Sequence, residues 1–137
     1  MKNLLIFCML IISASLSAQI NKGTVELENG ADEKISVPYQ TINCNLTQQD
    51  IDGLSFMVGL NARSVCKNRL SYTPRKIEIM QKSDTATVFI KFSAKNGYGA
   101  ESGLKMICEY KIKNLDKDRR DLLNDYVLIR NFGAIND

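Results

Sequence analysis

The sequence contains no histidine and no tryptophan, and only two prolines among its 137 residues. Histidine is the commonest general base and a common metal ligand, so its absence excludes Ser-His-Asp and Cys-His catalytic sites and His-based zinc sites. Apolar residues make up 45% of the chain and charged residues 24%. These values are ordinary for a globular protein, and they argue against disorder, collagen-like repeats and a polytopic membrane protein.

The N-terminus has the pattern of an export signal. Lys2 supplies a positive charge, residues 4–12 are apolar, and small residues lead to Ala18. The apolar stretch is shorter than the roughly 20 residues that a membrane-spanning helix needs. The sequence therefore predicts a signal peptide over residues 1–18 and one exported domain, periplasmic or extracellular, over residues 19–137. Removing 18 of the 137 residues leaves 119, the size of a single domain.

Hydrophobic periodicity predicts a mixed α and β fold. Thr47 and Asp50 form a helix-start pattern, and apolar residues at helical spacing then predict a helix over residues 48–66. A second helix is predicted over residues 116–130 because acidic residues precede an apolar stripe. Alternating residues and turn signals predict an N-terminal hairpin, with Pro38 placing its second strand at an edge, and a three-stranded meander. The expected architecture is α+β: an amphipathic helix on a three- to five-stranded antiparallel sheet, with a C-terminal helix.

The run from Val88 to Ala100 carries a family resemblance. It resembles a hairpin of poorly characterised small bacterial cell-envelope domains, in which a strand ends in the pattern V-x-A-[KQ]-N-[SG]-[FY]-G-[AG]. The resemblance covers about residues 65–113 and implies a helix followed by an antiparallel meander. It implies no catalytic residue or cofactor.

Three cysteines follow the predicted signal peptide: Cys44, Cys66 and Cys108. An oxidising compartment favours one disulfide and one remaining thiol. Cys44 and Cys66 flank the first predicted helix, which separates them by roughly 30 Å, whereas bridged Cα atoms lie within about 7 Å. We therefore expect a disulfide between Cys66 and Cys108, with Cys44 to Cys108 as the alternative. If neither bond forms, all three can be buried thiols.

One face of the predicted meander carries more apolar residues than solvent exposure favours. Met80, Phe89 and Ile107 point to this face, and Lys91 lies among them. Either the second helix or the N-terminal hairpin covers this patch, or a partner does. The four residues are the candidate interaction site.

The remaining chemistry-bearing residues suggest no cofactor and no metal. Asp50 and Asp52 are two apart on a helix and do not face each other, and the glycines near Tyr98 lack the spacing of a phosphate-binding loop. The acidic run Asp116, Asp118, Asp121 and Asp125 suits a helix start better than a calcium loop.

The sequence predicts an exported, non-enzymatic binding domain of the bacterial envelope, an inhibitor or immunity-type protein being one version. The alternative is a small thiol- or carboxylate-dependent enzyme. A protein or an anionic envelope polymer is the expected partner, because basic residues outnumber acids over residues 63–82. Nucleic acid and a membrane span after signal cleavage are not expected.

Overall fold

The computed structural model describes residues 18–137. The predicted signal peptide lies outside the described residues, apart from Ala18. The described chain forms six strands, one α-helix and a short 3-10 turn, in the order β1 (Ile20–Glu28), β2 (Lys34–Ile42), α2 (Gln48–Val65), η1 (Arg69–Ser71), β3 (Thr73–Lys82), β4 (Thr85–Lys95), β5 (Glu101–Ile112) and β6 (Tyr126–Asn136).

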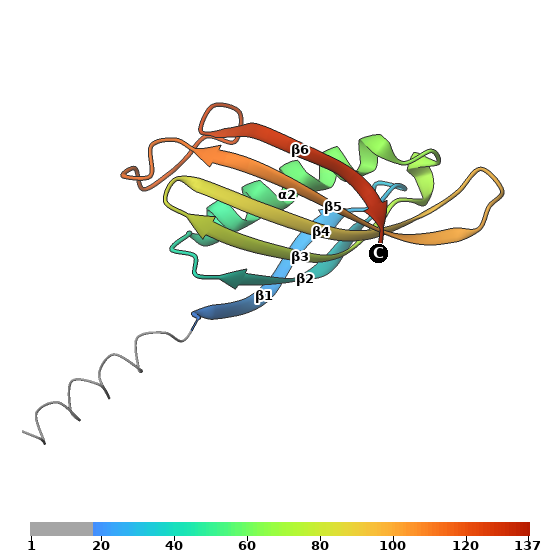
Figure 1. The fold of residues 1–137 in the computed structure, drawn as a ribbon, viewed down its shortest axis with the longest axis horizontal. Helices are drawn as coiled ribbons and strands as arrows, with labels where there is room; N and C mark the ends of the chain where they lie inside the picture. The colour runs from blue at the N-terminus through green and yellow to red at the C-terminus, as the bar shows by residue number, and fades with distance from the viewer. Residues whose placement is uncertain (1–17) are drawn as a thin grey trace, which may run out of the picture.

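The six strands form a single sheet in which spatial order follows chain order, β1-β2-β3-β4-β5-β6. All neighbouring pairs are antiparallel except β2 and β3, which are parallel over Tyr39–Ile42 and are joined by α2. Figure 1 shows α2 lying against one face of this sheet. The predicted fold class is therefore wrong in two respects: the sheet is six-stranded and mixed, and no C-terminal helix exists within residues 18–137.

The predicted helix over residues 48–66 is confirmed. α2 begins at a capping box in which Thr47 accepts a hydrogen bond from the Asp50 backbone, while the Asp50 carboxylate accepts from the Thr47 N–H. Its apolar stripe packs on the sheet through Ile51, Leu54, Val58 and Ala62. The opposing sheet residues come from strands β1 to β5: Val25, Val37, Ile77, Ile79, Val88, Ile90, Phe92, Met106, Cys108 and Tyr110.

Residues 126–136 form the edge strand β6 and not the end of a helix. Val127 and Ile129 flank Leu128, and β-branched residues lose side-chain freedom in a helix but fit a pleated strand. The preceding loop is fixed by Arg120, whose guanidinium donates to the carbonyl oxygens of Asn114, Leu115 and Lys117. The acidic run that suggested a helix start therefore belongs to this loop.

The N-terminal hairpin is confirmed, but Pro38 does not place β2 at an edge. β2 lies between β1 and β3. Its parallel ladder with β3 starts only at Tyr39, so Pro38 lies just outside that ladder. The missing proline N–H therefore removes no β2–β3 hydrogen bond.

The turn of this hairpin is held against the far end of α2. Gly30 donates its backbone N–H to the carbonyl oxygen of Tyr72, at 2.7 Å. Arg63 in the last turn of α2 donates to the carbonyl oxygen of Gly30 and pairs with Asp32, both at 2.9 Å. These contacts fix the hairpin relative to the helix.

Candidate functional site

The sheet has one covered face and one open face. α2 covers the face that carries Ile77, Ile90 and Met106, all fully buried. No helix or strand of residues 18–137 packs over the other face, which is turned toward the viewer in Figure 1. We call this second surface the open face. Strand alternation and the ladder register place on it Met80, Phe89, Lys91, Ile107 and Ile135, together with the charged residues around them. Phe132 joins this face through its contact with Arg130, which pairs with Glu109 of the same face.

The structure brings the four predicted patch residues together on this open face. Phe89 pairs directly with Ile107 across β4 and β5, and Met80 lies two residues beyond Glu78, which pairs with Phe89. Met80 is 44% exposed, whereas Phe89 and Ile107 are half-buried. The second helix expected to cover the patch is absent from residues 18–137, and the N-terminal hairpin continues the sheet instead of crossing over it.

Strand β6 extends the apolar patch with two residues that the sequence analysis missed. Phe132 and Ile135 are about half exposed, at 52% and 56%. Arg130 lies over the ring of Phe132, 5.4 Å from its centroid, a cation–π geometry. The sequence signal for this strand was the pair of β-branched residues Val127 and Ile129, which the helical interpretation overrode.

Three lysines lie side by side across the open face. Lys76 of β3 pairs with Lys91 of β4, and Lys91 pairs in turn with Lys105 of β5. We call this set the lysine row. Directly opposed residues in a sheet have Cβ atoms only about 5 Å apart, and like charges at that spacing disfavour the folded state. An unliganded sheet gains nothing from this arrangement.

Two acidic groups offset part of this charge. Glu78 forms an ion pair with Lys76, with its carboxylate oxygen 2.8 Å from the lysine Nζ. Asp137 forms one with Lys91, with its carboxylate oxygen 3.3 Å from Nζ. Lys105 is half-buried and forms no ion pair with any residue of the described range 18–137. The row therefore keeps an excess of positive charge, concentrated at Lys105.

The lysine row borders a hollow of about 260 Å³ on the open face. Phe89 contributes the only aromatic side chain of its lining, and the other lining residues are Lys76, Glu78, Lys91 and Lys105. This hollow combines an apolar surface with several ammonium groups. Such a site can hold an anionic group that carries an apolar neighbour.

A buried ion pair at the other end of the fold has a structural role. Asp50 accepts hydrogen bonds from the Arg120 guanidinium, the Tyr126 hydroxyl and the Thr47 backbone. Burial raises the pKa of Asp50, but the hydrogen bonds from Arg120 and Tyr126 outweigh it and lower the pKa to about 2. The carboxylate is thus ionised and fully engaged, and it joins α2 to the β5–β6 loop. Asp52 is exposed on the helix surface.

The three described cysteines are free thiols, so the expected Cys66 to Cys108 disulfide is not formed. Cys66 lines the same surface hollow as Ala94, near the end of β4, whereas Cys108 pairs with Val88, six residues earlier on that strand. The two cysteines thus lie at different positions along β4. The alternative bond from Cys44 to Cys108 is also not formed.

Each thiol sits in a setting that favours its protonated form. Burial raises the pKa of Cys44, Cys66 and Cys108. Cys44 donates to the carbonyl oxygens of Ile42 and Ile79, and Cys66 donates to that of Ala62. Protonated thiols are poor nucleophiles, so these settings do not favour catalysis by any of the three thiols.

The acidic loop residues are used in local hydrogen bonds. Asp125 accepts from the Asn114 side chain and from the Asp121 N–H. Within residues 18–137, no group of three or more acidic or cysteine side chains is placed to hold a metal ion. No helix of the described residues is long and apolar enough to span a membrane.

Comparison with known proteins adds no family to this picture. No family model, curated protein or solved structure matches the chain. The resemblance of residues 65–113 to envelope domains therefore stays a prediction.

Proposed function

We propose that this chain is an exported, non-enzymatic binding protein that docks a partner protein on the open face of its sheet. The observation that carries the proposal is the apolar patch of Met80, Phe89, Ile107, Phe132 and Ile135, drawn from four strands and left uncovered. A contiguous apolar patch with a charged rim is typical of an interaction surface. The predicted signal peptide supports a location of this surface in the bacterial envelope.

Site-directed photo-crosslinking tests this function. A photoreactive residue at position 107 lies inside the patch, and one at Asp52 lies on the exposed surface of α2, across the fold. We expect the first to form a discrete cross-linked product in cells and the second to form none. The introduction of Phe132→Asp into the same protein is expected to abolish the product. Equal cross-linking from both positions would refute docking on the open face.

An inhibitor or immunity-type protein is one specific form of this proposal. Such a protein blocks a toxin or lytic enzyme by covering its surface, which suits a small exported domain. Once a partner is cross-linked and purified, the test is whether the intact protein lowers the partner's reaction rate and the Phe132→Asp variant does not. If the intact protein binds the partner but does not change the partner's reaction rate, the binding proposal holds and the inhibitor proposal is wrong.

A further inference from the structure

The lysine row lowers the stability of the free protein, and an anion bound from outside would offset its charge. Lys76, Lys91 and Lys105 are neighbours on three adjacent strands, where a sheet is destabilised by like charges. Within residues 18–137, only two acidic groups, Glu78 and Asp137, form ion pairs with the row. An anion beside Lys105 would complete the balance of charge.

The lining of the hollow selects among anions. Phe89 offers its ring to an apolar group, and its strand partner Ile107 continues that apolar surface toward Phe132 and Ile135. A simple inorganic anion would leave this apolar surface uncovered. A carboxylate carried on a chain with apolar side chains would engage the ammonium groups and the patch together.

We infer that the hollow bordered by Lys76, Lys91 and Lys105 receives an aspartate or glutamate side chain of the partner protein, with an apolar partner residue seated against Phe89. This inference rests on the proposed function and specifies the partner's chemistry. The occupant is an acidic–apolar segment of a protein, and its carboxylate lies nearest to Lys105. Charge complementarity argues for this occupant, because the row keeps positive charge that no residue of the range 18–137 neutralises.

The inference is tested by NMR titration of the ¹⁵N-labelled protein with small probes. N-acetyl-Phe-Glu-amide is the positive probe, and N-acetyl-Phe-Gln-amide is its neutral match. We expect the glutamate probe to shift amides near residues 76, 89 and 105 and to bind at least fivefold more tightly than the glutamine probe. Equal affinities for the two probes, or shifts located elsewhere, would overturn the inference.

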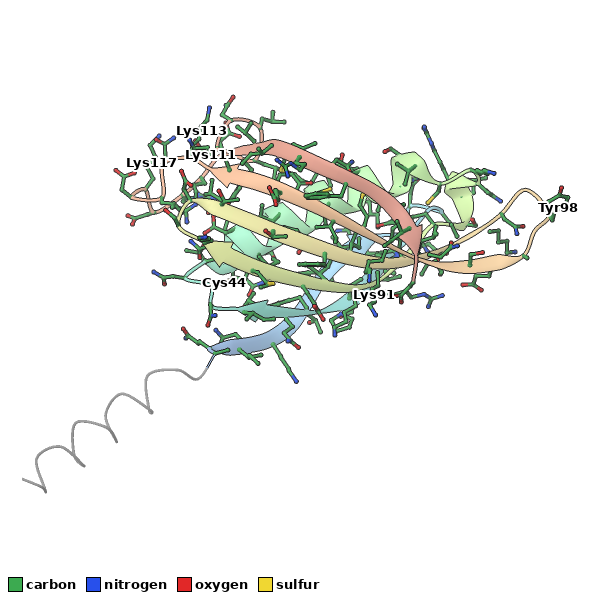
Figure 2. The ribbon with its side chains drawn as sticks, in the orientation of Figure 1. Cys44, Lys91, Tyr98, Lys111, Lys113 and Lys117 are labelled. Carbon is green, nitrogen blue, oxygen red and sulfur yellow. The ribbon has the colours of Figure 1, made fainter. Side chains whose placement is uncertain are left out.

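Variants separate binding from folding. Lys105→Gln removes the lysine that has no ion pair, so we expect an unchanged or raised unfolding midpoint together with at least fivefold weaker binding of the glutamate probe. Lys113→Gln is the matched control, because Lys113 is exposed in the β5–β6 loop, far from Lys91 (Figure 2). We expect Lys113→Gln to bind the probe like the parent protein. Equal weakening by both variants would show only a general charge effect and would count against the inference.

Two further probes distinguish other anions. Inorganic phosphate and phosphatidylglycerol vesicles carry negative charge without a protein side chain. If either binds through Lys105 more tightly than the glutamate probe, the occupant is not a protein carboxylate and the inference fails. A cross-linked partner at position 107 together with no preference for glutamate would overturn the inference alone and leave the proposed function standing.

Discussion

Gly30 lies where the backbone leaves no room for a side chain. A Cβ atom on Gly30 would overlap the backbone carbonyl oxygens of Arg69 and Leu70, which cannot move aside as a flexible side chain would. The close approach serves the hydrogen bond from Gly30 to Tyr72. The backbones of the hairpin turn and of the segment after α2 therefore approach each other closely.

We expect Gly30→Ala to destabilise the protein by about 2 kcal/mol or more, because overpacking against rigid backbone costs that much. Gly97→Ala is the control, since a Cβ on Gly97 meets nothing within 4 Å. Urea unfolding followed by circular dichroism measures both. Equal stability of the two variants would show that the segment after α2 shifts freely.

Asp50 makes the stability of the protein depend on pH in the acidic range. Its pKa is lowered from 3.8 to about 2 in the fold, so its contribution is complete above about pH 4 and is lost as the pH falls toward 2. The lost contribution amounts to about 2 kcal/mol. We expect unfolding midpoints to drop across this range in the parent protein and to drop less in Asp50→Asn. Parallel pH profiles for the two proteins would contradict the assignment.

At the scale of elements, periodicity predicted α2 and the meander because each is decided by local pattern. The capping box of Thr47 and Asp50 and the stripe from Ile51 to Ala62 act within one element, so sequence reasoning reached them. Residues 126–130 were wrongly predicted as the end of a helix because Leu122, Leu123, Tyr126 and Val127 match a helical stripe. In the fold, pairing with β5 outweighs that match.

The candidate site was predicted only in part for the same reason. Met80, Phe89 and Ile107 follow from strand alternation, so their shared face could be read from the sequence. The lysine row depends on the register between strands, which the turns set: Lys82 pairs with Thr85 at the end of the β3–β4 ladder, and the same register places Lys76 opposite Lys91. The bulge at Arg75 changes the pairing only beyond Lys76, at Pro74 and Thr73.

Gly133 provides a test of β6. It has a φ of +77° in the irregular part of the β5–β6 ladder, and a Cβ there meets nothing within 4 Å. Any loss of stability in the Gly133→Ala variant therefore comes from backbone strain, and we expect it to be about 1 kcal/mol. Gly103→Ala in β5 makes only ordinary contact and is the control. Thermal unfolding should separate the two variants. A Gly133→Ala variant as stable as the parent would argue against this strand geometry.

For the molecule as a whole, a polar substitution should cost much more stability on the covered face of the sheet than on the open face. Phe92 is buried under α2, whereas Phe132 is half exposed on the open face. We expect Phe92→Ser to cost about 3 kcal/mol or more and Phe132→Ser less than about 1 kcal/mol. Chemical denaturation of both variants checks this. A large loss for Phe132→Ser would mean that the open face is covered within the molecule.

The agreement between strand order and chain order has a kinetic consequence. Each strand from β2 to β6 pairs with the strand just before it in the chain. Four of these five pairings form across a hairpin or a loop. Only β2 and β3 must wait for α2 to form between them. Refolding should therefore be limited by this one long-range encounter, and a destabilised α2 should slow it more than a weakened hairpin would.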